Sequence, residues 1–180
     1  MNDRLHDQAA AGTRLLVAYT GEGDDLAYVT RTALGLAGEY GAKVILYDRD
    51  AASALADPWP NQWGSQGEGA QFGDPLSAEE LVKLGREPLA RQVAAAREDG
   101  VDAWAWLPEK HGTGALVDYA RHHAADVILL PDDLDEPGLA ERLMGETVEK
   151  AVDAAEESSD GIAVLLVAGD GSTRLAAGRL

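Results

Sequence analysis

Four carboxylates lie in a loop where parallel-sheet proteins often hold an anion. Residues 127 to 152 read VILLPDDLDEPGLAERLMGETVEKAV, which is an apolar strand-like run, a loop and a helical pattern. Such a loop can hold a phosphate, because backbone N–H groups and the positive end of the following helix converge there. This loop contains Asp132, Asp133, Asp135 and Glu136. Its chemistry therefore opposes a polyanion.

These carboxylates have two alternative roles. Asp135 or Glu136 precedes Pro137, and we expect one of them to cap the last helix, where negative charge is favourable. Asp132 and Asp133 are either solvated loop charges or oxygen ligands of a hard cation such as Mg²⁺ or Ca²⁺. Because the glycine-punctuated pattern of a calcium-binding loop is missing, we predict no resident metal.

Other residues with chemical potential are few. TGEGDD, residues 20 to 25, faintly resembles the pyrophosphate loop of adenylating enzymes, but Glu22 and Asp25 place negative charge there. A helix start capped by Asp24 or Asp25 is the favoured interpretation. His122 and His123 are adjacent on a predicted helix and point about 100° apart, so they cannot clasp one metal ion. The sequence contains no nucleophile elbow, zinc-binding histidine pair or catalytic triad, and we predict that the protein is not an enzyme.

Five short apolar runs must position these residues. Continuous apolar runs are typical of parallel strands buried on both faces, and apolar spacings of three and four between them indicate helices. This alternation predicts an α/β fold, with an open five-stranded parallel sheet covered by helices on both faces, as in Rossmann-like proteins. The runs are RLLVAY (14–19), AKVILY (42–47), VDAWAWL (101–107), DVILLP (126–131) and GIAVLLVA (161–168).

The chain is predicted to form one domain over residues 13–168, with flexible tails at 1–12 and 169–180. Residues 48–76 are rich in Gly, Pro and Gln and predict a long surface loop. Trp59 and Trp63 in that loop are large aromatic residues that need a surface to pack against. We expect that surface to be the ligand crevice, the dimer interface or a protein partner.

Two local features concern the second helical region. Ser77 and Glu80 predict a capping box at its start. Pro88 predicts either a kink or two shorter helices, with the proline in the first turn of the second. In the strand that follows, Trp104 and Trp106 alternate, so we expect both to face one side of the sheet as core packing.

The net charge of −17 at pH 7 excludes several classes of partner. Nucleic acids and anionic membrane surfaces both require a basic face. The chain also lacks a run of 18 apolar residues, and its polar start is not a signal peptide. With no cysteine, disulfides and thiolate chemistry are excluded. We expect an acidic cytoplasmic protein that binds neither nucleic acid nor membrane.

Several stretches of the chain resemble universal stress proteins. RLLVAYTGEGDDLAYVTRTALGLAGEYGAKVILY resembles the opening strand, helix and second strand of that family. HGTGALVDYARHHAADVILLP resembles its third helix and fourth strand, and LAERLMGETVEKAV followed by GIAVLLV resembles its last helix and last strand. The resemblance covers residues 14–168 apart from the loop. It implies a five-stranded sheet in the order 3-2-1-4-5 and a homodimer, frequently paired through the last strand.

The chain departs from the ATP-binding pattern of this family. Members that bind ATP have glycine, two residues, glycine, nine residues, then glycine followed by serine or threonine. Gly145 matches the final glycine, but Glu146 stands where the hydroxyl belongs. The earlier glycines are replaced in either of two alignments, by Asp132 and Asp135 or by Pro131 and Leu134.

The crevice at the carboxyl ends of the strands is the expected ligand site, because open parallel sheets bind ligands there. The family commonly has an aspartate after the first strand that contacts adenine, and Thr20 stands at that position. A threonine can still form a hydrogen bond. The candidate ligand-binding residues are Tyr19, Thr20, Gly21, Tyr47, Leu130, Asp132, Gly145, Glu146 and Thr147.

Charge decides against simple ATP binding. Two unit charges about 8 Å apart in water repel by roughly 0.5 kcal/mol, and physiological salt reduces this to about a third. Four loop carboxylates facing a triphosphate are therefore opposed by on the order of 2–3 kcal/mol, whereas a helix dipole contributes only about 0.3–1 kcal/mol. We predict a dimeric, non-enzymatic regulatory protein of the universal stress protein type, with a degenerate nucleotide site and no cofactor. The alternative is an adenine-nucleotide-binding member that uses Mg²⁺, with weak or no hydrolysis.

Overall fold

The computed structural model describes residues 15–21, 23–51, 75–108, 112–135, 148–157 and 161–178. The strands are β1 (Leu15–Thr20), β2 (Lys43–Asp48), β3 (Asp102–Trp106), β4 (Val127–Pro131), β5 (Ala163–Val167) and β6 (Thr173–Ala177). The helices are α2 (Ala27–Tyr40), α4 (Ala78–Lys83), α5 (Glu87–Glu98), α6 (Thr113–His122) and α8 (Val148–Glu157), with short 3₁₀ turns η1 (Asp24–Leu26) and η3 (Asp132–Asp135).

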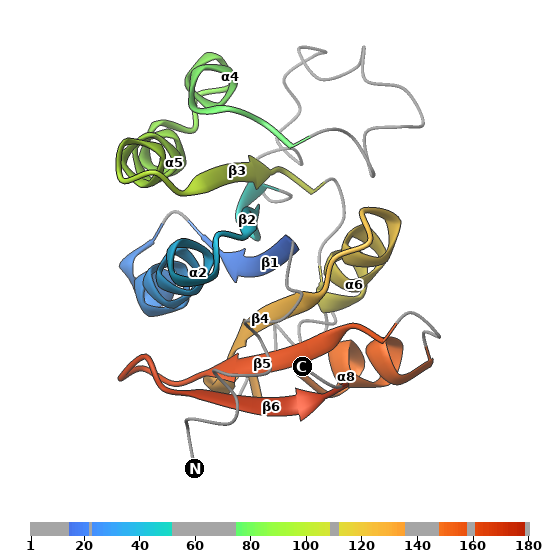
Figure 1. The fold of residues 1–180 in the computed structure, drawn as a ribbon. Helices are drawn as coiled ribbons and strands as arrows, with labels where there is room; N and C mark the ends of the chain where they lie inside the picture. The colour runs from blue at the N-terminus through green and yellow to red at the C-terminus, as the bar shows by residue number, and fades with distance from the viewer. Residues whose placement is uncertain are drawn as a thin grey trace, which may run out of the picture.

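The strands form a sheet in the order β3-β2-β1-β4-β5-β6 (Figure 1). β1 to β5 are parallel and keep the predicted order 3-2-1-4-5. The predicted number of five strands is wrong, because β6 adds an antiparallel sixth strand beside β5. A hairpin turn connects the two: Asp170 accepts a hydrogen bond from the Ser172 amide, and Gly171 has φ +85°.

The position of β6 corrects one expectation and bears on another. Residues 169–180 do not form a flexible tail throughout, since Thr173–Ala177 are a strand. The resemblance implies a homodimer paired through the strand at residues 161–168, and in this structure β5 has β4 on one side and β6 on the other. A homodimer paired through that strand would have to displace β6. Dimerisation itself stays a prediction.

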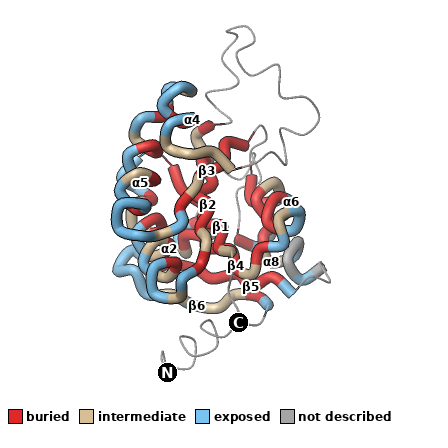
Figure 2. Tube along the Cα trace, turned by 45° about the horizontal axis from the view of Figure 1, so that its top comes forward, coloured by how far each residue is buried: buried red, intermediate tan, exposed pale blue. Residues whose placement is uncertain are grey.

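Helices cover both faces of the sheet, as predicted. α2 and α5 lie on one face and α6 and α8 on the other (Figure 1). All five residues of β4 and all five of β5 are buried, which explains why their sequences are continuously apolar. Figure 2 shows the same division, with buried strands in the centre and exposed residues along the outer sides of α2 and α5. The core is one sheet protected by two helical layers.

Local signals in the sequence are confirmed around α4 and α5. Ser77 and Glu80 form the predicted capping box. Of the two alternatives for Pro88, the structure has two separate helices, with the proline in the first turn of α5. Gly41 ends α2 in the left-handed conformation, with φ +63°. Across the described ranges, no helix is long and apolar enough to cross a membrane.

Candidate functional site

The carboxyl ends of β1 and β2 meet side by side. Tyr19 pairs with Tyr47 across the two strands, and Thr20 pairs with Asp48. The Thr20 side chain is buried, and its hydroxyl donates to the Tyr47 carbonyl oxygen at 2.9 Å. Gly21 follows directly, and a Cβ there would lie 2.6 Å from Asp50 Oδ2. The backbone at this corner therefore lies against a carboxylate, and the hydroxyl of Thr20 is already used inside the protein.

A buried ion pair closes the end of β2. Asp48 has no exposed surface, and the Arg86 side chain reaches it from the junction between α4 and α5. Arg86 Nε donates to Asp48 Oδ2 at 2.9 Å, its Nη2 contacts the same oxygen, and the Asp50 amide donates to Oδ1 at 3.0 Å. Burial raises the pKa of Asp48, and the Arg86 guanidinium opposes that rise. The sequence analysis missed this pair. Its visible signal was a charged residue directly after the apolar run VILY.

A second charged group surrounds Arg49. Its guanidinium forms ion pairs with Asp25, at the start of the α2 segment, and with Asp50. Arg49 thus joins the loop after β1 to the loop after β2. Both partners of this arginine are carboxylates of the same chain, so a bound anion would have to compete with them.

Tyr28 links the first turn of α2 to η3, which follows β4. Its hydroxyl donates to Asp133 Oδ1 at 2.9 Å. Burial raises the pKa of Tyr28, and Asp133 raises it further by accepting the hydrogen bond and by its charge. Asp132 and Asp25 contribute to the same rise through their charges, which places all three carboxylates around one phenol. Asp25, Asp132 and Asp133, with Tyr28 among them at the carboxyl ends of β1 and β4, are called the acidic crevice from here on.

The predicted ligand residues have different outcomes. Thr20 and Gly21 lie together at the end of β1, and Asp132 begins η3 directly after β4. The Leu130 side chain is fully buried within β4. Gly145, Glu146 and Thr147 lie outside the described residues, as do Trp59 and Trp63.

Tyr19 and Tyr47 belong to a row of aromatic rings. Their rings stack with centroids 5.5 Å apart, Tyr47 contacts Trp106 at 5.2 Å, and Trp106 stacks on Tyr119 of α6 at 3.8 Å. The register explains the row, because Tyr19, Tyr47 and Trp106 occupy matched positions on β1, β2 and β3. The Tyr47 hydroxyl also donates to the Gly112 carbonyl oxygen at 3.3 Å. Four rings thus fill the space between the sheet and α6, and both predicted tyrosines pack against protein.

The two tryptophans of β3 behave differently from each other. Trp106 is 3% exposed and packs in the core, as predicted. Trp104 is half-buried at the amino end of the sheet, where its ring lies 4.0 Å from the Arg97 guanidinium carbon and 5.0 Å from Lys43 Nζ. Its indole N–H donates to Asp102. For Trp104 the contacts are therefore cation–π and polar as well as apolar.

Among the described residues, no group of three or more histidine, aspartate or glutamate side chains is arranged to hold a metal ion. The adjacent His122 and His123 rings contact each other edge to face at 5.2 Å.

Comparison with known proteins places the fold. No family model matches the sequence, and no curated protein matches it. A solved structure described as the crystal structure of a universal stress protein in complex with cAMP is similar, with a TM-score of 0.51 and 17% sequence identity. The match covers 90% of this chain and 100% of that one. The α/β sheet with helices on both faces therefore matches the Rossmann-like fold of a universal stress protein.

Proposed function

We propose that this chain is a non-enzymatic regulatory protein of the universal stress protein type that does not bind ATP. The observation that carries the proposal is the acidic crevice. Asp25, Asp132 and Asp133 stand after β1 and β4, and Arg49 is paired with Asp25 and Asp50. The strand order reverses between β1 and β4, which is where such sheets bind ligands.

Electrostatics supports the exclusion of a triphosphate. Each carboxylate about 8 Å from a phosphate charge adds roughly 0.2 kcal/mol of repulsion at physiological salt. Three carboxylates against about four phosphate charges then sum to about 2 kcal/mol, or roughly thirtyfold in affinity. To bind the triphosphate, Arg49 would have to leave its two carboxylate partners.

Hydrogen bonding supports the same conclusion. Thr20 stands where an adenine contact is expected, and its hydroxyl donates to a backbone carbonyl 27 residues away. The Tyr28 hydroxyl donates to Asp133, and this bond connects the first turn of α2 to η3. A nucleotide would have to break these bonds or bind without them.

Calorimetric titration tests the proposal. We expect no binding heat from ATP or AMP, with or without Mg²⁺, and no release of phosphate from ATP. Replacing Asp132 and Asp133 with asparagine separates charge from shape: ATP binding that appears only in this variant assigns the exclusion to charge. Saturable binding of ATP by the unmodified chain would contradict the proposal.

An adenine-nucleotide-binding protein is the second candidate. It is favoured by one observation, the cAMP named in the description of the similar structure. A cyclic monophosphate carries a single negative charge, so the acidic crevice would repel it about a quarter as strongly as ATP. Mg²⁺ bridging the carboxylates and a phosphate is the other route to this function. Titration with cAMP, and with ATP plus Mg²⁺, distinguishes these routes.

Dimerisation and a cytoplasmic location complete the proposal. With β6 beside β5, the dimer surface must lie elsewhere or must form after β6 moves. Light scattering on the full chain measures the oligomeric state directly.

A further inference from the structure

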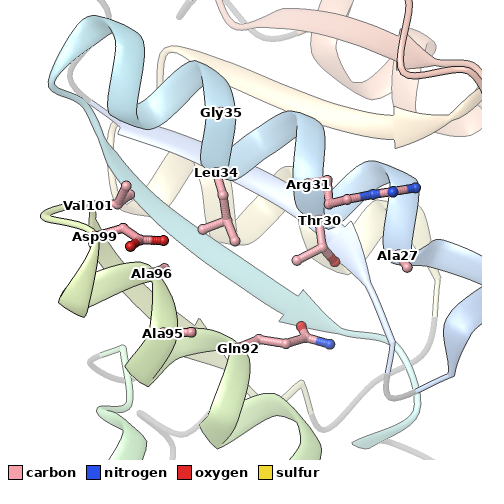
Figure 3. A pocket seen from close by; sticks show the side chains of 10 residues that line it. All are labelled: Ala27, Thr30, Arg31, Leu34, Gly35, Gln92, Ala95, Ala96, Asp99 and Val101. Atoms are coloured by element: carbon pink, nitrogen blue, oxygen red, sulfur yellow. The ribbon is translucent and has the colours of Figure 1, made fainter.

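A groove of about 470 Å³ lies between α2 and α5, on the sheet face opposite α6 and α8 (Figure 3). This volume is in the range of small-molecule pockets. No residue of the acidic crevice lines this groove, so a ligand of the groove is independent of the proposed function. Both helices run along the same sheet face, and their facing side chains are small enough to leave the space between them open.

The middle of the groove is apolar. Leu34 points into it from α2, with Ala96 of α5 and Val101 on the opposite side (Figure 3). Gly35 and Ala95 form its exposed rim. An aliphatic chain placed here would cover the half-buried side chains of Leu34 and Val101.

Polar groups gather at the end nearest the start of α2. Arg31 is exposed there, and it forms no ion pair with any residue that the structure describes. Gln92 lies across the groove from Thr30, and its amide oxygen is buried with no hydrogen-bond partner among the described residues. A half-turn of this amide would direct its N–H groups into the groove. This end therefore offers the Arg31 guanidinium, and the Gln92 amide is a donor there only in the turned orientation.

The other end of the groove limits the length of a ligand. Asp99 lines that end, seven residues beyond Gln92 on the same helix and its cap. At 1.5 Å per residue, the two positions are about 10 Å apart along the helix axis. A chain of about eight carbons spans this distance, and a second negative charge at its far end would meet Asp99.

We propose that the groove between α2 and α5 binds a medium-chain aliphatic carboxylate. The carboxylate pairs with the Arg31 guanidinium, the Gln92 amide turns by half a rotation to donate to it, and the aliphatic chain lies along Leu34, Ala96 and Val101. Charge complementarity selects this class, because the cation is at one end of an apolar channel and the anion is at the other. A dicarboxylate is disfavoured by Asp99.

Octanoate is the probe, with octanol and octylammonium as ligands of matched length and different charge. Amide chemical shifts of the full chain report the binding position. We expect saturable octanoate binding that shifts the amides of Gly35 and Val101. Arg31→Leu should weaken octanoate about tenfold and leave octanol within about twofold. Ala95→Trp, which fills the groove from its exposed rim, should abolish both.

Arg91→Leu is the matched control, because Arg91 is an exposed arginine of α5 that does not line the groove. It should leave octanoate affinity unchanged, and circular dichroism checks the fold of each variant. The proposal is overturned by the absence of saturable octanoate binding. It is equally overturned if octanol or octylammonium binds as tightly as octanoate, or if Arg91→Leu weakens octanoate as much as Arg31→Leu does.

Discussion

Asp48 and Arg86 show how single residues are placed by partners far away in the chain. Asp48 ends an apolar strand, and from the sequence it belongs equally well to the start of the surface loop. Its partner is 38 residues further on, at the junction between two helices. A buried carboxylate and a buried guanidinium each require the other, because an unpaired charge in the interior is costly. The pair attaches the α4–α5 junction to the end of β2.

A double-mutant cycle tests this pair. Asp48→Asn should lower the free energy of unfolding by about 3 kcal/mol, because it leaves the Arg86 cation buried without its carboxylate. Arg86→Met should cost a similar amount for the converse reason. The double variant should recover most of the loss, since no uncompensated charge remains. Urea denaturation provides the free energies.

Arg91→Met is the control for this cycle, because Arg91 is an exposed arginine on α5. We expect it to change stability by no more than about 0.5 kcal/mol. A double variant that loses the full sum of the two single changes would refute the coupling.

At the scale of elements, β6 decides what β5 exposes. β5 is a strand of five buried apolar residues, AVLLV, and without a neighbour on its outer side it would present unpaired backbone groups. β6 is less apolar and less buried than β5: Arg174 is exposed, and Ala177 is the one buried residue of the strand. It is held by antiparallel pairing and by the close approach of Gly178, where a Cβ would lie 2.4 Å from the Ile162 carbonyl oxygen.

Removal of β6 should therefore promote self-association. A chain truncated after Ala168 exposes the outer side of β5, and we expect it to form larger assemblies than the full chain in light scattering. Truncation after Gly178 removes only two residues and serves as the control. Gly178→Ala is a milder test, because the new Cβ collides with Ile162 at a φ of +78° and should loosen β6. If the truncated chain stays folded and keeps the assembly state of the full chain, β6 has no such role.

Across the whole molecule, negative charge dominates. Thirty-two acidic residues against fifteen basic ones leave the chain at −17. Within the described residues the interior neutralises what it buries, as Arg86 does for Asp48, so the excess lies on the surface and in the loops. Self-repulsion of this kind destabilises the compact state and is weakened by salt.

Salt should consequently stabilise the fold. Raising NaCl from about 0.02 M to about 0.5 M shortens the screening length from roughly 20 Å to about 4 Å. We expect the free energy of unfolding to rise by on the order of 1 kcal/mol. Urea midpoints at the two salt concentrations measure the change, and a midpoint that falls with salt would count against surface repulsion as the dominant electrostatic effect.

Local patterns in the sequence determined much of this protein. Five apolar runs separated by helical spacings predicted the parallel strands, and Ser77 and Glu80 predicted the capping box. These features depend on residues a few positions apart, so periodicity and propensity are sufficient to predict them. The acidity of the loop after β4 is also visible in the sequence, and it is a property of that segment alone.

Tertiary structure decided the features that depend on distant partners. Thr173–Ala177 form a strand because β5 offers a side to pair with, and Tyr19 and Tyr47 turn into an aromatic row because register aligns them with Trp106. The groove exists because α2 and α5, whose nearest ends are 47 residues apart in the chain, face each other with four small residues, Ala27, Gly35, Ala95 and Ala96. Pairing, register and the distance between helices are set by packing across the whole core. A single segment carries no information about them.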